Sequence, residues 1–473
     1  MTTRRRGQSM KARPFSPAWR PAAVLLSLLV PLSAQTPDQQ LARDIFKQLI
    51  EINTTDSSGD NTRAAEAMAA RFRAAGFPPE DIHLLAPTPR KGNLVVRFRG
   101  VGTARPVLFL GHLDVVEARR SDWSLDPFHL TEQDGFFYGR GTSDMKGDDA
   151  ILVSTFLRLK REGFRPSRDL ILALTSDEES GPANGADWLV KNHRDLIDAE
   201  FCINSDGGGG DIKNGRHLFM SVQAAEKVFL SFRLEVTNPG GHSSLPTRDN
   251  AIYHLAGGLS RLGKFDFPVR IFDVTKTMFA RTAALYPGQL GADMRRIAQN
   301  PDDAQATAGL SDLPQWNAQI RTTCVATMLS GGHAENALPQ TASAVVNCRL
   351  LPVDSQAEVE KTLVRVLADP EIKVSVMTPA KPVAYKPMNP RVLDAITKAT
   401  HQVWPGLPVI PGMSAGASDS IYLIAAGIPA YGVSGIFTDE DDQRAHGKDE
   451  RILVPSFYDA LNFADALIRT LAN

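Results

Sequence analysis

The stretch LILALTSDEESG, residues 170–181, joins an apolar run typical of a buried strand to three consecutive acids, Asp177, Glu178 and Glu179. Carboxylates at the end of a buried strand repel one another and lose hydration, so cations, buried positive charge or shared protons must compensate. One interpretation is a pair of metal ions, with different roles for Glu178 and Glu179. The other is a solvated acidic turn before a helix, whose N-terminus favours carboxylates. This stretch alone favours neither.

Metal-ligating side chains follow other strand-like runs in the same way. The apolar run 107–110 leads to His112, and the run 201–204 leads to Asp206. In open α/β sheets the carboxyl ends of the strands converge on the binding crevice. These side chains are therefore predicted to meet Glu178 and Glu179, whereas Asp177 is expected to be a local structural residue.

Two further candidates lie in loops. Asp144 belongs to a glycine-punctuated loop, residues 139–147, and His446 lies late in the chain beside two acids. The loop does not match a phosphate-binding motif, because the G-K-[ST] ending and the G-x-G-x-x-G spacing are both absent. Two imidazoles with three or four carboxylates form a ligand set that suits Zn²⁺, with Co²⁺ or Mn²⁺ as alternatives. No cysteine lies among them, which excludes a structural cysteine–zinc site.

The spacing of His112 and Asp114 suggests that they act together. Residues two apart on an extended segment point to the same side. A carboxylate hydrogen-bonded to a metal-bound imidazole fixes its tautomer and raises its basicity. Taken alone, the motif favours the plainer interpretation of a histidine at a strand end followed by an aspartate in a turn.

Strands alternating with helices predict an α/β sandwich with a largely parallel sheet. Apolar residues recur at helical spacing over residues 37–77, and helices are also predicted over 150–159 and 185–192. Short apolar runs predict strands at 93–98, 106–110, 170–174 and 201–204. The pattern returns after about residue 383, with a strand at 430–433 and a closing helix at 455–471.

Between these two parts, the pattern of apolar and polar residues changes at about Glu226. Residues 227–236 alternate as a half-exposed strand does, and further strands are predicted at 322–328, 342–349 and 372–377. Helices are predicted after Asn250 and at 358–367, whereas residues 262–317 look irregular, as in a lid or an interface extension. We therefore predict a catalytic domain of residues 35–225 and 379–473, with an inserted α+β lid or dimerisation domain of residues 226–378.

Length and charge narrow the functional classes. The 473 residues fit two domains, and the net charge of −1 gives no reason to expect nucleic acid or an anionic membrane as the main partner. A basic N-terminus precedes an apolar run at 22–30 and small residues at 33–34, which predicts a signal peptide cut after Ala34 and a secreted or periplasmic protein. The run is short for a membrane span, so an uncleaved anchor is the less favoured alternative.

The three cysteines, Cys202, Cys324 and Cys348, are too few for a disulfide scaffold. Cys324 and Cys348 lie on two predicted strands that flank a glycine-rich turn, so they are candidates for a pair. Buried free thiols are the commoner outcome, and the sequence leaves the pairing open.

Five motifs, in this chain order, resemble the M20 family of dizinc exopeptidases and amidohydrolases. That family includes glutamate carboxypeptidase, succinyl-diaminopimelate desuccinylase, acetylornithine deacetylase, aminoacylase-1 and carnosinase-type dipeptidases. The resemblance covers nearly all of the chain after residue 34. Its motifs are G-H-L-D at 111–114, G-R-G-T-S-D-M-K-G at 139–147, S-D-E-E-S-G at 176–181, G-H-S-S-L-P at 241–246 and H-G-K-D-E at 446–450.

The resemblance implies a fold of the dizinc exopeptidase type and a role for each ligand. Asp144 would bridge both metals, with His112 and Asp206 at one site and Glu179 and His446 at the other. A cis peptide would follow Asp144.

It also implies the residues that carry out the reaction. Glu178 would be the general base on a water that bridges the metals, and Asp114 would orient His112. His242 would reach the active site, commonly from the partner subunit of a homodimer formed through the inserted domain, and stabilise the oxyanion.

Asn336 and Arg349 resemble positions that contact the polar end of the substrate. Arginine suits a terminal carboxylate because its planar fork binds bidentately. Without the resemblance, His242, Asn336 and Arg349 would be interpreted as a turn-capping histidine, a turn asparagine and a surface arginine.

The predicted function is therefore an exported dizinc hydrolase that cleaves the amide bond of small peptides next to a free carboxylate, as dipeptidases and carboxypeptidases do. The alternative is an N-acyl-amino-acid amidohydrolase. Asp206, where some members carry Glu, favours the dipeptidase and aminoacylase branches, and Asp449 stands where many relatives carry Asn. A third hypothesis is an exported binding protein that has lost catalysis, which the complete ligand set and Glu178 disfavour.

Overall fold

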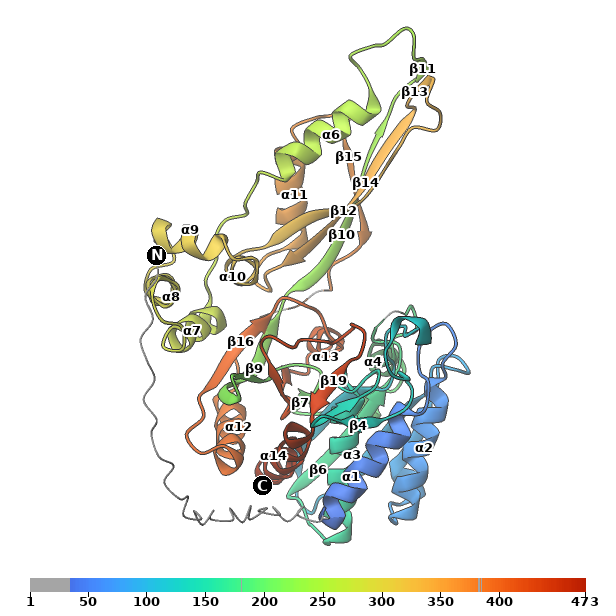
Figure 1. The fold of residues 1–473 in the computed structure, drawn as a ribbon, viewed down its shortest axis with the longest axis vertical. Helices are drawn as coiled ribbons and strands as arrows, with labels where there is room; N and C mark the ends of the chain where they lie inside the picture. The colour runs from blue at the N-terminus through green and yellow to red at the C-terminus, as the bar shows by residue number, and fades with distance from the viewer. Residues whose placement is uncertain (1–34, 180, 382, 384) are drawn as a thin grey trace, which may run out of the picture. The chain divides into compact units, whose positions relative to one another are not determined.

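The structure is a computed structural model that describes residues 35–179, 181–381, 383 and 385–473 (Figure 1). The predicted signal peptide, residues 1–34, lies outside the described residues. Among the described residues, no helix combines the length and the apolar character needed to cross a membrane.

The largest sheet has ten strands, and its middle strands are parallel, as predicted. Successive residues of β6 face opposite sides, so Leu170, Leu172 and Leu174 enter one core while Ile171 and Ala173 enter another. Burial on both faces explains the unbroken apolar run. The strand order is β1 (Ile82–Leu85), β2 (Asn93–Phe98), β6 (Arg168–Thr175), β3 (Ala104–His112), β7 (Phe201–Asn204), β17 (Ala430–Gly432), β9 (Arg216–Glu226), β8 (Gly209–Lys213) and β18 (Phe437–Asp439), with β16 (Val409–Ser414) paired to β9.

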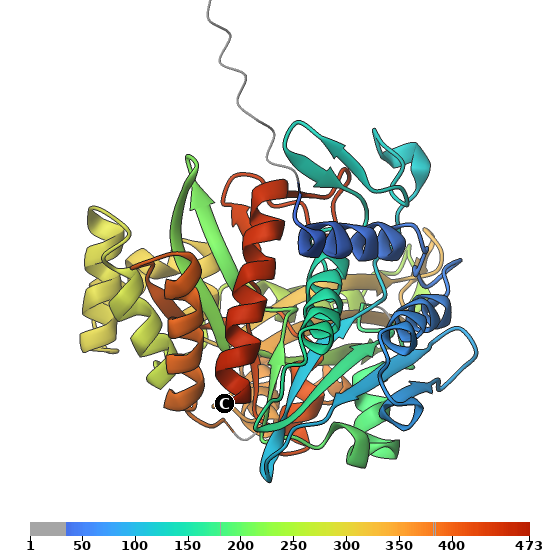
Figure 2. The ribbon, with the colours of Figure 1, turned by 90° about the horizontal axis from the view of Figure 1, so that it is seen from below.

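Helices cover both faces of this sheet, which confirms the predicted α/β sandwich (Figure 2). On one face lie α1 (Pro37–Ile50), α2 (Asn61–Ala74), α3 (Lys146–Arg161), α12 (Pro390–Val403) and α14 (Val454–Ala472). On the other lie α4 (Gly185–Asn192), α5 (Arg194–Ile197) and α13 (Ser420–Ala425). A separate three-stranded sheet is formed by β19 (Arg451–Leu453), β5 (Phe136–Tyr138) and β4 (Thr131–Gln133).

The single helix predicted over residues 37–77 is two helices. The apolar spacing is interrupted at residues 51–60, which are mostly polar, and Asp60 caps α2 by accepting hydrogen bonds from the backbone N–H groups of Thr62 and Arg63. An N-cap aspartate begins a new helix rather than continuing an old one.

A second, four-stranded sheet contains the strands predicted after residue 226. Its order is β12 (Thr323–Gly331), β14 (Thr341–Leu350), β10 (Val228–Thr237) and β15 (Lys373–Thr378). Helices α6 (Ala251–Leu262) and α11 (Gln356–Leu367) pack on one face, and alternate residues of β10 from Val228 to Val236 fill the core beneath them. A two-residue ribbon pairs β11 (Gly241–His242) with β13 (Ala337–Leu338).

The expectation that residues 262–317 are irregular is wrong. The segment contains the helices α7 (Asp273–Thr282), α8 (Gln289–Gln299), α9 (Ala304–Ser311) and α10 (Pro314–Ile320). The helices are 7 to 11 residues long and loops separate them, so no single apolar period runs through the segment, although α8 repeats Leu290, Met294 and Ile297 at helical spacing. They share a core that includes Phe279, Ile297 and Leu310 and also takes in Ile410 of β16.

The structure decides the pairing of Cys324 and Cys348, which the sequence leaves open. Cys324 and Cys348 face each other in the register of β12 and β14 and form a disulfide, with Cα atoms 4.1 Å apart. Adjacent antiparallel strands bring directly opposed side chains within bonding reach. Cys202 is free and buried, as expected.

Candidate metal centre

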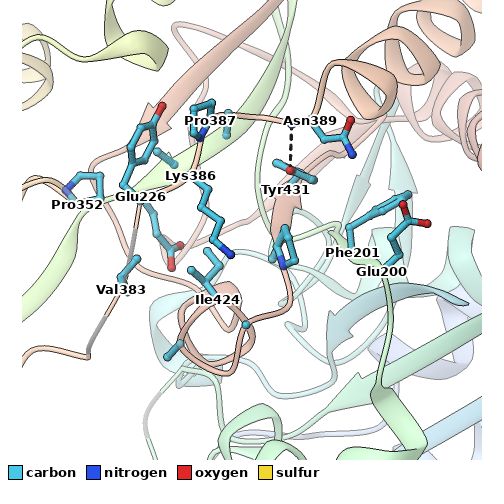
Figure 3. Close-up of a pocket in the computed structure, with 17 residues that line it drawn as sticks. Glu200, Phe201, Glu226, Pro352, Val383, Lys386, Pro387, Asn389, Ile424 and Tyr431 are labelled. Carbon is cyan, nitrogen blue, oxygen red and sulfur yellow. Dashed lines mark hydrogen bonds between the residues drawn. The ribbon is translucent and has the colours of Figure 1, made fainter. Parts of the chain in front are cut away.

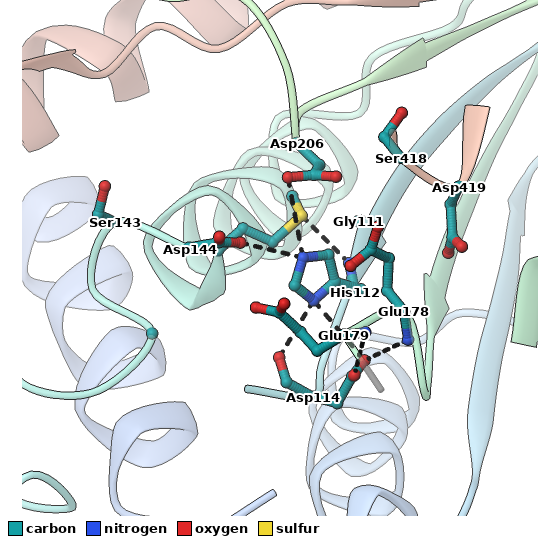
Figure 4. Close-up of polar contacts among 12 residues, drawn as sticks. Gly111, His112, Asp114, Ser143, Asp144, Glu178, Glu179, Asp206, Ser418 and Asp419 are labelled. Carbon is teal, nitrogen blue, oxygen red and sulfur yellow. Dashed lines mark hydrogen bonds and ion pairs between the residues drawn. The ribbon is translucent and has the colours of Figure 1, made fainter. Parts of the chain in front are cut away.

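Three neighbouring parallel strands end at one edge of the large sheet and deliver the predicted acids and histidine to one place (Figure 4). β3 ends at His112, β6 ends at Thr175 just before Glu178 and Glu179, and β7 ends two residues before Asp206. Parallel strands carry their carboxyl ends on the same side, so the prediction that these side chains meet is confirmed.

Asp144 lies between two imidazoles. Its Oδ1 is 3.1 Å from Nε2 of His112, and its Oδ2 is 3.0 Å from Nε2 of His446. The second histidine also lies 3.1 Å from Oε1 of Glu179, and the first lies 3.8 Å from Oδ1 of Asp206. The Asp144–Met145 peptide is cis, as the resemblance implies.

These side chains fit a pair of metal ions in chemistry and in spacing. The sets His112–Asp144–Asp206 and Asp144–Glu179–His446 each bring one ligand atom per residue within 4.8 Å of the others. Two ligands at about 2.0–2.1 Å from a tetrahedral ion lie about 3.3 Å apart, close to the distances seen here. A third set, His112 with Glu178 and Glu179, meets the same distance limit.

The electrostatics of the cluster call for positive charge. Burial lowers the pKa of His112, but the hydrogen bonds and charges of Asp144 and Asp206 outweigh it and hold the pKa well above its ordinary value. Hydrogen bonds to Asp144 and Glu179 raise the pKa of His446 to about 10. Burial also raises the pKa of Asp206. Cations bound among these carboxylates would meet this demand.

Asp114 contacts His112 differently from the simple prediction. Nδ1 of His112 lies 3.1 Å from the backbone carbonyl oxygen of Asp114 and 3.6 Å from its carboxylate Oδ1. That carboxylate accepts hydrogen bonds from the backbone N–H groups of Glu178 at 3.1 Å and Glu179 at 2.9 Å. Asp114 therefore orients the imidazole mainly through its main chain, and its side chain fixes the two glutamates that follow β6.

Glu178 lies beside the cluster, yet it contributes only to the third set of metal-ligating residues. Burial, more than any neighbouring charge, raises the pKa of Glu178 to about 9. A carboxyl group with a raised pKa, next to a metal-ligating set, is typical of a general base.

Asp177 has a structural role, and the contacts of Asp419 were not predicted. Asp177 is buried, pairs with Lys91 and accepts the backbone N–H of Ala183 at 2.9 Å. Asp419 accepts hydrogen bonds from Thr175 Oγ1 at 2.8 Å and Asn184 Nδ2 at 2.6 Å, and burial raises its pKa to about 6. No local spacing in the sequence links residues so far apart.

The remaining predicted site residues lie on or beside the strands of the smaller sheets. His242 is exposed on β11, opposite Ala337, and the carbonyl of Asn336 accepts the N–H of Ser243 at 3.1 Å. Arg349, on β14, lies with its guanidinium carbon 4.8 Å from the ring centroid of Phe229. Among the described residues, no recorded contact joins these three to the cluster.

A cavity of about 390 Å³ lies apart from the cluster (Figure 3). Its lining is largely apolar, with Phe201, Ile424 and Tyr431 in its walls and the buried Glu226 among them. None of the described cluster side chains lines it. The cavity is therefore not the site that the sequence motifs predict.

Comparison with known proteins supports the same assignment. Residues 108–470 match the model of peptidase family M20/M25/M40. The chain is 29% identical over 353 residues to the N-fatty-acyl-amino acid synthase/hydrolase PM20D1 of Xenopus tropicalis, covering 73% of this chain and 69% of that protein. It is 27% identical to the probable carboxypeptidase S-like 2 of Dictyostelium discoideum, covering 80% and 74%.

A solved structure shares the fold. An M20 family metallo-carboxypeptidase from Sulfolobus solfataricus superposes with a TM-score of 0.69 at 18% identity, over 91% of this chain and 99% of that one. The family match spans most of the chain and all the ligands of the cluster. The chain therefore belongs to peptidase family M20/M25/M40 and is a metal-dependent hydrolase of that family.

Proposed function

We propose that this chain is an exported dizinc hydrolase that cleaves an amide bond beside a free carboxylate. The observation that carries the proposal is Asp144, whose two oxygens face His112 at 3.1 Å and His446 at 3.0 Å. One carboxylate between two ligand sets suits two ions about 3.5–4 Å apart. We assign His112 and Asp206 to one ion, Glu179 and His446 to the other, and Asp144 to both.

Glu178 is the general base in this proposal. Bound Zn²⁺, or Co²⁺ or Mn²⁺ in its place, lowers the pKa of water and polarises the scissile carbonyl. Glu178 takes the proton of the attacking water and returns it to the leaving amine. Burial alone would keep Glu178 protonated, and the charge of two bound cations would return it to the ionised form that a base needs. The hydrogen bond from its N–H to Asp114 fixes its backbone.

Arg349 is assigned to bind the substrate carboxylate, and Asn336 is assigned to contact the same polar end of the substrate. Arg349 is half-buried, and burial lowers its pKa. A partly desolvated guanidinium binds an anion more strongly than a fully solvated one does. Its stacking on Phe229 holds the planar group in one orientation.

Two substrate classes share this chemistry. Similarity to the N-fatty-acyl-amino acid synthase/hydrolase of Xenopus tropicalis favours N-acyl amino acids as substrates. Similarity to the carboxypeptidase S-like protein favours small peptides. Relatives named for N-fatty-acyl-amino acids match this chain in Xenopus tropicalis, Bos taurus and Homo sapiens, so we place N-acyl amino acids first and dipeptides second. This order reverses the one favoured by the sequence motifs alone.

A homodimer through the second sheet completes the proposal. Strand β12 is an edge strand, and its Val325, Met328 and Leu329 are 60%, 67% and 71% exposed. An unpaired edge with exposed apolar side chains is a ready surface for a second copy. His242, which is also exposed, would then serve the partner's metal cluster rather than its own.

Export and the domain division belong to the same proposal. The signal-like N-terminal sequence supports export, and so does the Cys324–Cys348 disulfide, because disulfides persist in oxidising compartments. The separate cores of the two sheets support an inserted domain of residues 226–378.

The proposal is tested by measuring free amine released from a panel of N-acyl amino acids and dipeptides, each also supplied as its C-terminal amide. We expect hydrolysis of the free-carboxylate compounds, loss of activity with a chelator and recovery with Zn²⁺. Binding of these compounds without any turnover in the metal-loaded protein would instead support the binding-protein hypothesis.

A further inference from the structure

Glu450 is a buried carboxylate directly beneath the loop that carries Asp144. Its Oε1 accepts the backbone N–H groups of Ser143 at 2.7 Å and Asp144 at 3.0 Å. Its Oε2 accepts the N–H of Gly141 at 3.1 Å and Nη1 of Arg140 at 2.6 Å. Four donors on one carboxylate leave this loop little freedom to move.

Arg140 extends the connection to the loop that carries His446. Its Nη2 donates to the carbonyl oxygen of Gly447 at 2.9 Å and to that of His446 at 3.3 Å. The guanidinium carbon also lies 5.0 Å from the ring centroid of Trp123. The planar fork of arginine can hold several such bonds at once, which a lysine ammonium cannot do in the same geometry.

The pair is costly to bury, so its presence needs a reason beyond stability. The side chains of Arg140 and Glu450 are 2% and 0% exposed. A buried ion pair often stabilises a fold no better than apolar residues of the same volume would. The pair holds two loops in a fixed position relative to each other, although Arg140 and Glu450 are 310 positions apart in sequence.

We infer that Arg140 and Glu450 are positioning residues that set Asp144 and His446 at the spacing needed to hold one metal ion together. The observed result of that positioning is the 3.0 Å approach of His446 Nε2 to Asp144 Oδ2. The inference rests on the proposed function and adds residues that touch neither metal nor substrate. Their effect reaches the site through the backbone of its ligands.

The test compares two acid-to-amide changes at adjacent positions. Glu450→Gln keeps the shape of the side chain but places an amide NH₂ against N–H donors, because only one acceptor oxygen remains. Asp449→Asn is the matched control, because Asp449 accepts the N–H and hydroxyl of Ser124, at 2.8 and 2.9 Å, rather than a bond from a metal-ligand loop. An asparagine can keep one of these bonds, and the serine hydroxyl can rotate to accept the other.

The readout is metal binding, followed by visible absorption during Co²⁺ titration and by competition with a chelator for Zn²⁺. We expect Glu450→Gln to lower the affinity for one of the two ions about 10–100-fold, because loss of a residue that supports a metal ligand typically has this effect. Asp449→Asn should bind both ions as the wild type does. The turnover number of Glu450→Gln should recover at saturating Zn²⁺, which a general loss of folding would not allow.

Arg140→Lys keeps the inference testable if Glu450→Gln does not fold. Lysine retains the positive charge but not the planar guanidinium, so this variant should lower the affinity for the same ion. Wild-type metal affinity in either folded variant would overturn the inference while leaving the proposed function intact. A wild-type chain that binds no metal at all would overturn both.

Discussion

The metal cluster and the β11–β13 ribbon differ in how completely one chain builds them. The ligands of the cluster have close partners within the chain: Asp144 contacts two histidines, and Asp114, which orients His112, accepts two backbone N–H groups. His242 on the ribbon is exposed, and its side chain bonds only to nearby Ser244 among the recorded contacts of described residues. In the proposed homodimer, one chain would supply the metal centre and a second copy would supply the oxyanion donor.

The largest effect is expected inside the cluster. Glu178→Gln should lower the turnover number by about 10²–10⁴-fold, because the proton of the attacking water loses its acceptor. Metal content should stay at the wild-type value by elemental analysis, because none of the proposed ligands is changed. Wild-type turnover by the metal-loaded variant would contradict the base assignment.

The next effect tests the ribbon. His242→Ala should lower turnover by about 10²–10³-fold without loss of metal, the usual cost of one oxyanion donor. Dissociating and remixing this variant with Glu178→Gln should restore activity at roughly a quarter of the sites, since a mixed dimer has one complete site.

No recovery on mixing, with mixed dimers verified by mass, would mean that His242 serves its own chain or none. The comparison between a self-contained cluster and a shared ribbon would then fail.

A smaller effect is expected at the substrate end. Arg349→Met should raise KM for a free-carboxylate substrate by about 10–100-fold, because a charge-assisted contact of roughly 1.5–3 kcal/mol is lost. The C-terminal amide of the same substrate should be affected much less. Equal losses on both would separate Arg349 from carboxylate recognition.

The smallest effect concerns His254 of helix α6, which packs on the second sheet. Hydrogen bonds to Asp369, and then to Asp249, raise the pKa of His254. The contribution of protonated His254 to the free energy of unfolding is therefore fully present below the ordinary pKa of about 6.5. It is lost as pH rises through the pKa of the folded state. His254→Asn should therefore cost under about 1 kcal/mol of unfolding free energy near pH 5.5, and less near pH 9, by urea titration. A cost that grows with pH would contradict the ion pairing.

The sequence predicted the cluster better than it predicted the parts around it. Leu170–Leu174 lies in a strand because apolar residues face both cores, and the motif order then placed the ligands at strand ends. The helices α7–α10 were not predicted because loops break the segment into pieces of 7 to 11 residues, and the helical spacing of Leu290, Met294 and Ile297 in α8 was overlooked. The bonds of Glu450 to residues 140–144 escaped it because no local pattern encodes contacts across some 300 residues.

The pairing of Cys324 with Cys348 was within reach of the sequence. Both cysteines lie on predicted strands, but the register that opposes them depends on the bulge between Ala326 and Met328 and on the length of β12. Register is set by the whole face of a strand and its turn rather than by two residues.

The most direct test of the central claim is the number of metal ions bound by the wild type and by Asp144→Ala, measured by elemental analysis after equilibration with Zn²⁺. The shared carboxylate predicts about two ions per chain in the wild type and a loss of both in the variant, because each ion loses a ligand. A wild type that binds a single ion, or a folded Asp144→Ala variant that retains two, would contradict the account.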